Sequence, residues 1–291
     1  MEHAVLGAGA IGGLVGTAVA SLGERVTVLV RPERLLGYPA NLSVERPSGA
    51  ITSPVKVAAT LPNPVDVLWI ATKTYQLKTA LQAVQSLPRC IVPLLNGVDH
   101  IEVLRAHFGG DRVLPATIAV EAERIAPGRF VQRSSFVNLN LAAGGEQVLG
   151  AIVARLRELE FTCRFIQNEQ TLLWSKLCFL GPFALVTSAS GMNKGEIYAD
   201  AEWKSKLISA IAEACAVAKA SRAEVDAAQI QAIVDGLPPV IRSSMQKDVA
   251  SRRQLELDAI GGPIVRGGEC YGIDTSTTAA LMAVIRGKAT E

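Results

Sequence analysis

The stretch that decides the fold lies close to the N-terminus and has the sequence Gly7-Ala8-Gly9-Ala10-Ile11-Gly12. Its three glycines have the spacing G-x-G-x-x-G, directly after an apolar run at residues 3–6 and at the start of a helical pattern over 11–22. A second apolar run, rich in valine, follows at residues 26–30. Between a strand and a helix, this spacing is typical of a loop that binds the pyrophosphate of a dinucleotide.

Each glycine of this loop has its own predicted role. Gly7 permits the tight turn, Gly9 lets the backbone approach the pyrophosphate, and Gly12 lets the helix pack closely on the sheet. The N-terminus of the helix offers unpaired N–H groups and the positive end of its dipole to the phosphates. The candidate dinucleotide-binding residues are therefore Gly7, Ala8, Gly9, Ala10, Ile11 and Gly12. The alternative is a glycine-rich turn that binds no ligand.

The first half of the chain alternates short apolar runs with helical spacing. The runs at residues 3–6, 26–30, 67–71, 91–95 and 113–120 are rich in Val and Ile, which predicts strands buried on both faces. Helical patterns lie between them at residues 11–22, 75–87 and 99–108. This alternation predicts an α/β domain with a Rossmann-type, doubly wound parallel sheet. Residues 41–57 predict a hairpin insertion, and residues 130–141 a further antiparallel strand region.

The second half has a different character, because strand-like runs nearly vanish after about residue 165. Helical spacing over residues 171–188, 201–220, 223–237, 239–260 and 275–287 predicts an all-α C-terminal domain. We place the boundary at residue 166, with a dinucleotide-binding Rossmann domain over 1–166 and a helical substrate-binding and catalytic domain over 167–291.

Composition and charge narrow the class of protein. Apolar residues make up 49% of the 291 residues and charged residues 19%, which supports large buried cores. The formal net charge of +2 is too small for a nucleic-acid or membrane footprint, so we expect neither partner. The apolar stretch at residues 14–22 is shorter than the roughly 20 residues that a membrane span needs.

The cysteines and the N-terminal segment indicate the cellular compartment of the protein. The five cysteines are odd in number and far apart, and they form no C-x-x-C pair, so we expect neither a disulfide framework nor a metal site. The N-terminal segment does not resemble a secretory signal, because it has no basic stretch followed by an apolar run and a cleavage site. These features predict a cytoplasmic protein, and a homodimer stays open as its assembly.

The end of the second predicted strand bears on the choice of cofactor. A site for NAD usually carries Asp or Glu here, to hold the ribose 2′-hydroxyl. This chain has Val30-Arg31-Pro32 with Arg34 close by, and no carboxylate precedes Arg31. Because an arginine can pair with a 2′-phosphate, Arg31 favours NADP(H) over NAD(H). A solvated surface arginine is the alternative.

Two further polar residues follow predicted strands at their carboxyl ends, where open parallel sheets bind ligands. Lys73 follows the run at 67–71, and Asn96 follows the run at 91–95. We expect both to contact the cofactor. The alternatives are a solvent-facing lysine and an ordinary Asn-Gly turn.

Candidate acid–base residues lie in the helical half. Lys176 stands among Trp174, Leu177 and other apolar residues, where burial would lower its pKa and suit it to donate a proton near neutral pH. A lysine that extends its head to solvent is the alternative. Arg252 and Glu256 are four residues apart, so a helix would place them on one face. A surface ion pair is the alternative for these two.

The whole chain resembles the ketopantoate reductases (2-dehydropantoate 2-reductases). The shared motifs run in order from the initial G-A-G-A-I-G-G to the helical half and span nearly the full length. They are Gly7–Gly13, Arg31, Thr72-Lys73-x-Tyr75-Gln76, Leu95-Asn96-Gly97, Trp174-x-Lys176-Leu177, Gly195-Glu196, Ser243-Ser244-Met245-x-x-Asp248 and Arg252-x-x-Glu256-x-Asp258.

The resemblance implies a Rossmann domain, a helical domain and an active site in the cleft between them, with NADPH as hydride donor. By the same resemblance, Lys176 is the general acid and Glu256 lies near the lysine and the cofactor. Ser244 binds the carboxylate of a 2-oxo acid, and Lys73 and Asn96 hold the cofactor.

The chain departs from the family at three substrate-binding positions. The helix that carries the lysine usually presents Asn four and eight residues later, where this chain has Leu180 and Ala184, separated by Gly181-Pro182. A further family Asn is Lys194 here. Because three amides that bind the substrate are missing, a more apolar 2-oxo acid or ketone is an alternative to ketopantoate. A non-catalytic NADP-binding sensor or interaction module is the other alternative, and the presence of both Lys176 and Glu256 argues against it.

Overall fold

The computed structural model describes residues 1–290 of the chain, with side chains up to residue 288. It divides the described chain into two compact units. The first, which we call the sheet unit, comprises Met1–Leu95 and His100–Gln167. The second, the helical unit, comprises Asn96–Asp99 and the chain from Asn168 onward.

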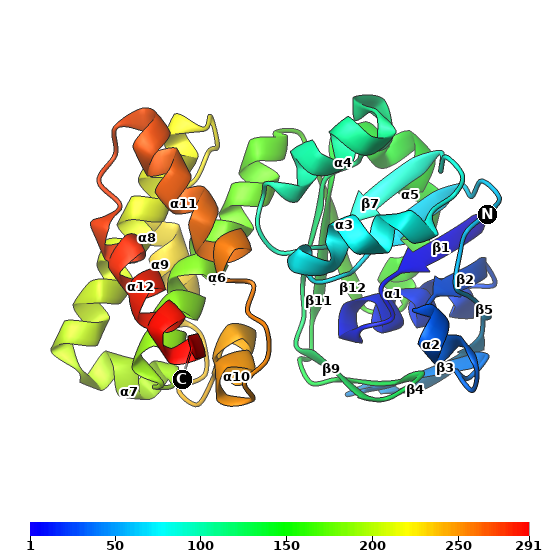
Figure 1. Ribbon diagram of the computed structural model, residues 1–291, viewed down its shortest axis with the longest axis horizontal. Coiled ribbons are helices and arrows are strands. Elements are labelled where there is room, and N and C mark those ends of the chain that lie inside the picture. The colour runs from blue at the N-terminus through cyan, green and yellow to red at the C-terminus, as the bar shows by residue number, and fades with distance from the viewer. Residues whose placement is uncertain (291) are drawn as a thin grey trace. The chain divides into compact units, whose positions relative to one another are not determined.

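A five-stranded parallel sheet forms the centre of the sheet unit, which confirms the predicted fold class (Figure 1). Its strand order is β5-β2-β1-β6-β7, so the chain crosses over after β5 to reach β6 on the other side of β1. The strands are β1 (Glu2–Leu6), β2 (Arg25–Leu29), β5 (Lys56–Ala58), β6 (Val67–Ile70) and β7 (Cys90–Pro93).

The two faces of this sheet bury different helices. Ala4 and Leu6 belong to a core that also contains residues of α3 (Leu77–Ala80) and α4 (His100–Phe108). Val5 faces the other way, toward α1 (Ala10–Ser21), where it approaches the glycines of the helix. The helix predicted over 75–87 is broken into η1 (Thr74–Gln76), α3 and η2 (Leu81–Ala83).

A four-stranded sheet packs on α1, with the order β4-β3-β10-β9. The predicted insertion is present as the hairpin of β3 (Asn41–Arg46) and β4 (Gly49–Pro54). The other two strands are β9 (Ala122–Ala126) and β10 (Arg129–Gln132), and α2 (Pro32–Leu35) precedes the hairpin. Phe130 fills the space that the missing side chain of Gly13 leaves on α1, so this contact is specific to glycine.

The prediction of a strand over residues 113–120 in the parallel sheet is wrong in its bounds and in its sheet. The strand is shorter, β8 (Ala116–Ala119), and it belongs to a three-stranded sheet of order β12-β11-β8. Leu114 still donates to the carbonyl of Ile91 on β7, but Pro115 has no N–H to continue that pairing. The region predicted at 130–141 is likewise split between β10 and β11 (Val137–Ala142), which lie in different sheets.

Two elements complete the sheet unit. Strand β12 (Phe161–Ile166), which was not predicted from the sequence, pairs in parallel with β11, and α5 (Glu146–Glu158) packs on it.

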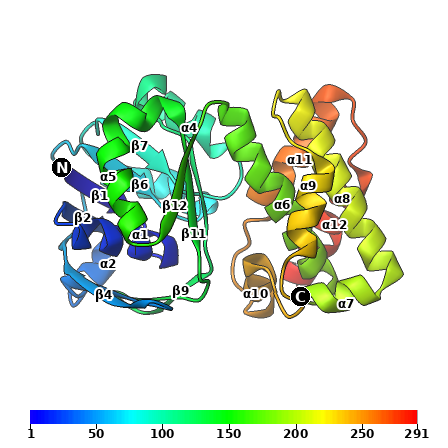
Figure 2. The same cartoon turned by 180° about the vertical axis from the view of Figure 1, so that it is seen from behind.

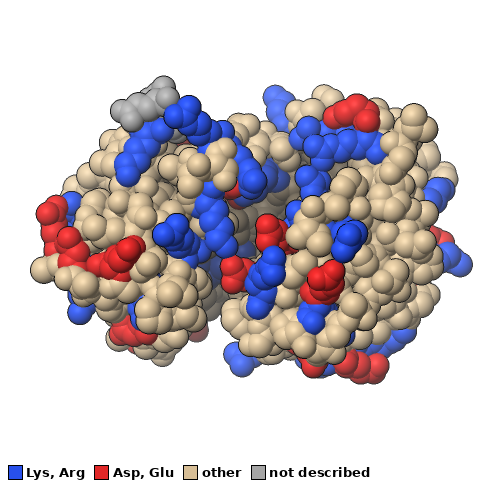
Figure 3. Space-filling model, turned by 90° about the horizontal axis from the view of Figure 1, so that it is seen from below, with Lys and Arg blue, Asp and Glu red and all other residues tan. Residues whose placement is uncertain are grey.

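In Figure 3 side chains of both signs occur on each unit, in keeping with the net charge of +2.

The helical unit is built around α6 (Glu169–Ser190), which packs against most of the other helices. Figure 2 shows α6 beside α8 and α9. The remaining helices are α7 (Lys194–Ala199), α8 (Ala201–Ala220), α9 (Ala227–Asp235), α10 (Ser244–Ala250), α11 (Leu257–Tyr271) and α12 (Ser276–Thr290). By length and composition α6 could cross a membrane, but 78% of its most apolar window is buried inside the structure, as in the core helix of a soluble protein.

The single helix predicted over 239–260 is wrong. Helix α10 ends at Ala250 and α11 begins at Leu257, with a turn between them in which Arg252 has a φ of 51°. A non-glycine residue in this left-handed region ends the helical path, so Arg252 and Glu256 do not share a helix face.

Candidate active site

The structure requires glycine at two positions of the dinucleotide loop. Gly7 has a φ of 105°, and a Cβ there would lie 2.8 Å from the carbonyl carbon of Ala71 on the neighbouring chain segment. A Cβ on Gly12 would collide with the carbonyl oxygen of Gly7. The tight turn and the close packing of α1 therefore depend on these two residues.

Gly9 differs, because the protein itself leaves room for a side chain there. Its φ is −82°, and the nearest atom to a Cβ would be the carbonyl oxygen of Ala71 at 4.0 Å. Gly9 is also the N-cap of α1; no side chain caps that end of the helix, and its first turn carries no acidic residue. Open space in front of uncapped N–H groups fits a pyrophosphate. The residues present therefore fit a dinucleotide.

The other predicted cofactor contacts of the sheet unit lie at the carboxyl ends of strands. Arg31 follows β2, and its side chain is 59% exposed. Glu33, in the first turn of α2, lies 3.9 Å from Arg31 and forms a weak ion pair with it. Lys73 is half-buried in the turn directly after β6. A phosphate at Arg31 would have to compete with the Glu33 carboxylate.

Lys176, Asn96 and Glu256 are brought together in the helical unit. Lys176 Nζ, on α6, donates to Asn96 Oδ1 at 2.9 Å. Asn96 Nδ2 in turn donates to Glu256 Oε2 at 3.4 Å, and Glu256 is the buried N-cap of α11. Three residues that are far apart in the sequence thus form one hydrogen-bonded chain.

The environment of Lys176 tunes its proton affinity. Burial lowers the pKa of Lys176 to about 8, because the charged form is poorly solvated, while the nearby Glu256 carboxylate acts in the opposite direction. An ammonium with such a pKa is largely protonated at neutral pH and still gives up its proton readily. The arrangement suits a general acid.

The segment Asn96–Asp99 is fixed to α11 by its glycine and its aspartate. Gly97 has a φ of 84°, and a Cβ there would collide with the carbonyl oxygen of Ala259. Arg266 of α11 pairs with Asp99 and also, at 2.9 Å, with Asp258. These contacts hold Asn96 at the end of Lys176.

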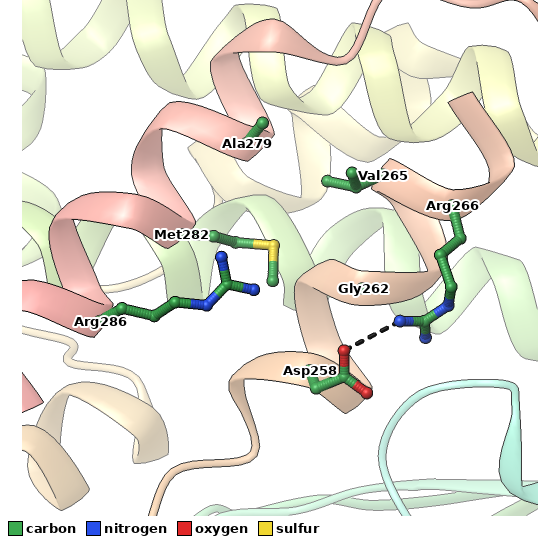
Figure 4. A pocket seen from close by; sticks show the side chains of 7 residues that line it. All are labelled: Asp258, Gly262, Val265, Arg266, Ala279, Met282 and Arg286. Atoms are coloured by element: carbon green, nitrogen blue, oxygen red, sulfur yellow. Dashed lines mark hydrogen bonds and ion pairs between the residues drawn. The ribbon is translucent and has the colours of Figure 1, made fainter. Parts of the chain in front are cut away.

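The same arginine lines a small hollow between α11 and α12 (Figure 4). Its lining residues are Asp258, Gly262, Val265, Arg266, Ala279, Met282 and Arg286. Figure 4 shows the guanidinium of Arg266 turned toward Asp258, so this cation is engaged with carboxylates of its own unit. Among the residues that the structure describes, no group of three or more His, Cys, Asp or Glu could hold a metal ion.

Helix α6 continues through Pro182 without interruption, so residues 176, 180 and 184 follow one another along it. Leu180 is partly exposed, as Lys176 is. Ala184, in contrast, is completely buried in the core of the helical unit. Of the two apolar replacements, only Leu180 is accessible to a ligand.

Ser244 is exposed at the first position of α10, and its neighbours fix that helix to α6. Ser243 caps α10 by accepting from the N–H of Gln246, and its hydroxyl lies 2.7 Å from that of Thr187 on α6. The Gln246 side chain donates to the carbonyls of Gly191 and Met192. These positioning roles were not predicted from the sequence, although Ser-Ser before a helical pattern is an N-cap signal.

Lys194 is buried, and its ammonium group binds backbone carbonyls of the helical unit. Its Nζ donates to the carbonyls of Asp235 and Leu237, at 2.6 and 3.0 Å, and lies 4.7 Å from the centre of the Tyr198 ring. A cation at the C-terminal end of α9 is favourable because it satisfies unpaired carbonyls. This lysine therefore links the start of α7 to the C-terminal end of α9 by hydrogen bonds.

Two family models match the chain. The model described as "Ketopantoate reductase PanE/ApbA" matches residues 3–145, and "Ketopantoate reductase PanE/ApbA C terminal" matches residues 168–289. The 2-dehydropantoate 2-reductase of Caulobacter vibrioides is 31% identical over 299 residues, which cover 98% of this chain and 98% of the relative.

Solved structures share the fold over their whole length. A ternary structure of D-mandelate dehydrogenase with NADH and anilino(oxo)acetate matches with a TM-score of 0.88 at 22% identity, over 100% of this chain and 99% of that one. A dimeric ketopantoate reductase from Staphylococcus aureus matches with a TM-score of 0.81 at 19% identity, again over 100% and 99%.

Proposed function

Because the chain belongs to the ketopantoate reductase family, we propose that it uses NADPH to reduce a 2-oxo acid to a 2-hydroxy acid, with 2-dehydropantoate as the nominal substrate. Membership makes the protein an oxidoreductase that acts on a CH–OH group with a nicotinamide cofactor and a small-molecule substrate. The product of the nominal reaction is pantoate, and with that substrate the enzyme would act in pantothenate biosynthesis.

The observation that carries the proposal is the hydrogen-bonded chain around Lys176. The nicotinamide, when bound, supplies a hydride to the carbonyl carbon of the oxo acid. Lys176 then gives a proton to the oxygen on which negative charge develops. Asn96 holds the ammonium in place through its Oδ1, and Glu256 raises the pKa of the lysine and so keeps it charged. Ser244 is our candidate for binding the substrate carboxylate.

Arg31 supports NADPH over NADH, because only NADPH carries a 2′-phosphate for the guanidinium to bind. The proposal is tested by the affinity of Arg31→Ala for each cofactor. We expect a loss of about tenfold or more for NADPH and little change for NADH, since a charge-assisted hydrogen bond contributes about 1.5–3 kcal/mol. Equal losses for both cofactors would contradict this role.

A second candidate substrate is a more apolar 2-oxo acid. Leu180 supports it, because a leucine cannot pair with a substrate hydroxyl, and leaving that hydroxyl buried and unpaired costs about 1–3 kcal/mol. The match to D-mandelate dehydrogenase with anilino(oxo)acetate supports it too, since a protein of this fold binds an aryl-bearing oxo acid. Lys194 does not compensate for the lost amides, because its ammonium already binds two backbone carbonyls.

One assay tests these candidates together. NADPH oxidation is followed by absorbance with ketopantoate, a branched apolar 2-oxo acid and a neutral ketone of similar shape. We expect both acids to be reduced, the apolar one with the higher kcat/KM, and the neutral ketone to be poor because it lacks the carboxylate. A clear preference for ketopantoate would reject the role of Leu180. Tight NADPH binding without any turnover would instead favour a non-catalytic sensor.

We further propose a cytoplasmic homodimer. The dimeric match from Staphylococcus aureus supports the assembly, and the five free cysteines, four of them buried, are consistent with a reducing compartment. Light scattering on the purified protein tests the assembly, and a monomer mass across the accessible concentration range would contradict it.

A further inference from the structure

Arg124, on β9, reaches the dinucleotide loop from a different sheet. Its Nη1 donates to the carbonyl oxygen of Ala8, the second residue of the loop, at 3.4 Å. Arg124 is exposed, so its side chain is accessible to a ligand. A positive charge thus lies at the loop that fits the pyrophosphate.

Strand pairing explains why the side chain lies there. Arg124 is directly opposite Phe130 across the antiparallel pair β9–β10. Residues directly opposite in such a pair present their side chains to the same face of the sheet. Phe130 packs against Gly13 of α1, so the shared face is the one that covers this helix. The fold itself therefore directs Arg124 toward the N-terminal part of α1.

Neighbouring arginines provide a contrast. Arg129 pairs with Glu45 at 3.4 Å, and Arg133 pairs with Glu123 at 3.2 Å. Arg124 has no carboxylate within 4.0 Å among the residues that the structure describes, and its hydrogen bond to Ala8 uses only one of five N–H donors. Of these three arginines, the one that lies on the dinucleotide loop is thus the one without an ion-pair partner.

Arg124 is also close to a second cation of the sheet unit. Tyr38 lies within the electrostatic influence of both Arg124 and Arg34; burial raises the pKa of Tyr38, and the two cations act in the opposite direction. Arg34 belongs to α2, directly after Arg31 and the end of β2. Cations from two separate elements, Arg124 of β9 and Arg34 of α2, therefore both lie near Tyr38.

We propose that Arg124 binds the pyrophosphate of the nicotinamide cofactor, with one N–H on the Ala8 carbonyl and others on phosphate oxygens. The inference rests on the proposed function only in that the ligand is a nicotinamide dinucleotide. Pyrophosphate is common to NADPH and NADH, so Arg124 contributes to the affinity for both. This separates it from Arg31, whose proposed partner is the 2′-phosphate.

Equilibrium binding tests the assignment without any substrate. NADPH, NADH and ADP-ribose, which has the pyrophosphate but no nicotinamide, are titrated into the full-length protein and into Arg124→Gln, with detection by fluorescence or calorimetry. Loss of a charge-assisted hydrogen bond should weaken all three by a similar factor of about 10 to 100. The matched control is Arg129→Gln, which removes an arginine of the paired strand β10 whose partner is Glu45, and its affinities should equal those of the unmodified protein.

Two outcomes would overturn the proposal. Unchanged affinity of Arg124→Gln for all three ligands would show that the arginine only contacts the loop. A loss for NADPH alone would show that it binds the 2′-phosphate and not the pyrophosphate. The more conservative Arg124→Lys, which keeps the charge, should recover part of the affinity, and unchanged thermal unfolding shows that both variants fold. A protein that binds cofactor but reduces no oxo acid would reject the proposed function and leave this inference intact.

Discussion

Gly9 is the residue of the dinucleotide loop at which the fold leaves room for a side chain, so we attribute the glycine to the proposed pyrophosphate. A Cβ at Gly9 meets no protein atom closer than 4.0 Å, so Gly9→Ala should leave the free energy of unfolding unchanged or slightly higher. The same methyl group would occupy space that the pyrophosphate needs. We expect cofactor affinity to fall by about tenfold or more, since overpacking costs about 1–3 kcal/mol.

The control for this variant is Gly12→Ala. Its Cβ would collide with the carbonyl oxygen of Gly7, so it should destabilise the fold itself. Urea unfolding and cofactor titration of both variants make the comparison. Normal cofactor affinity in a folded Gly9→Ala would show that no phosphate approaches this part of the loop.

The pKa of Lys176 predicts how the reduction rate depends on pH. The general acid must be protonated, so kcat/KM should be flat below the lysine pKa of about 8 and fall about tenfold per pH unit above it. Removing the Glu256 carboxylate, which raises this pKa, should move the fall to lower pH in Glu256→Gln. A profile that stays flat well above pH 8, or that does not move in the variant, would assign the proton transfer to another group.

Single residues differ in how far sequence could predict their roles. The loop glycines could be identified because their roles depend on neighbours close in the chain. The bond between Asn96 and Lys176 joins residues 80 positions apart, and the sequence assigned Asn96 only to the cofactor. Lys194 was expected near the substrate, yet its partners are carbonyls 41 and 43 positions away, which no local pattern reveals.

Among the elements, α6 carries two of the proposed determinants of substrate choice, Leu180 and Ala184. Leu180 is partly exposed on the turn after Lys176, so Leu180→Asn offers an amide to a substrate hydroxyl without disturbing the core. We expect kcat/KM to shift toward ketopantoate by about five- to tenfold relative to an apolar oxo acid, for a hydrogen bond of about 1 kcal/mol. The ratio of the two kcat/KM values is the measurement, and an unchanged ratio would place the substrate elsewhere.

Ala184→Asn, one turn further along α6, should behave differently. Ala184 is fully buried among apolar side chains, so an amide there would be larger than the space and would lack partners. We expect a loss of about 1–3 kcal/mol in the free energy of unfolding. Urea unfolding measures this, and a stable variant with altered specificity would show that the core opens at this point.

The pairing of β1 with β6 contains a buried histidine that makes the stability depend on pH. His3 is fully buried on β1, and its Nδ1 accepts from Trp69 Nε1 on β6 at 3.1 Å. Burial lowers the pKa of His3 from 6.5 to about 4. As pH falls through this window the unfolded chain takes up a proton that the folded chain does not, so folding stability declines.

The size of this decline is testable by difference. Relative to His3→Gln, which cannot titrate, the unmodified protein should lose about 3 kcal/mol of unfolding free energy between pH 6.5 and pH 4. Urea unfolding at several pH values gives both curves. Parallel curves over this window would mean that His3 is protonated without cost in the folded state.

Elements with a strong local pattern could be predicted, while their ends and partners could not. The parallel strands β1, β2, β6 and β7 are continuous apolar runs, and α8 has clear helical spacing. The strand at 113–120 was placed in the wrong sheet because a single proline redirects it. The helix predicted over 239–260 failed because the left-handed turn at Arg252 occurs at a residue type that rarely adopts it.

At the scale of the whole molecule, the fold and the family agree with the sequence motifs from end to end. The two family models together match residues 3–145 and 168–289, and a relative at 31% identity covers nearly the whole chain. Choice of substrate depends on a few side chains within that common fold. The missing amides at positions 180, 184 and 194 are therefore compatible with the same reaction on a different oxo acid.

We propose that the protein transfers a hydride from NADPH to the carbonyl carbon of a 2-oxo acid while Lys176 donates the proton. The most direct test uses NADPH deuterated at the transferred position, with product analysis by mass spectrometry. The account predicts a 2-hydroxy acid with one deuterium at C2, formed in step with NADPH loss, and a rate lower by about 10²- to 10⁴-fold in Lys176→Ala with cofactor affinity unchanged. A product without deuterium, or a Lys176→Ala variant with normal turnover, would contradict it.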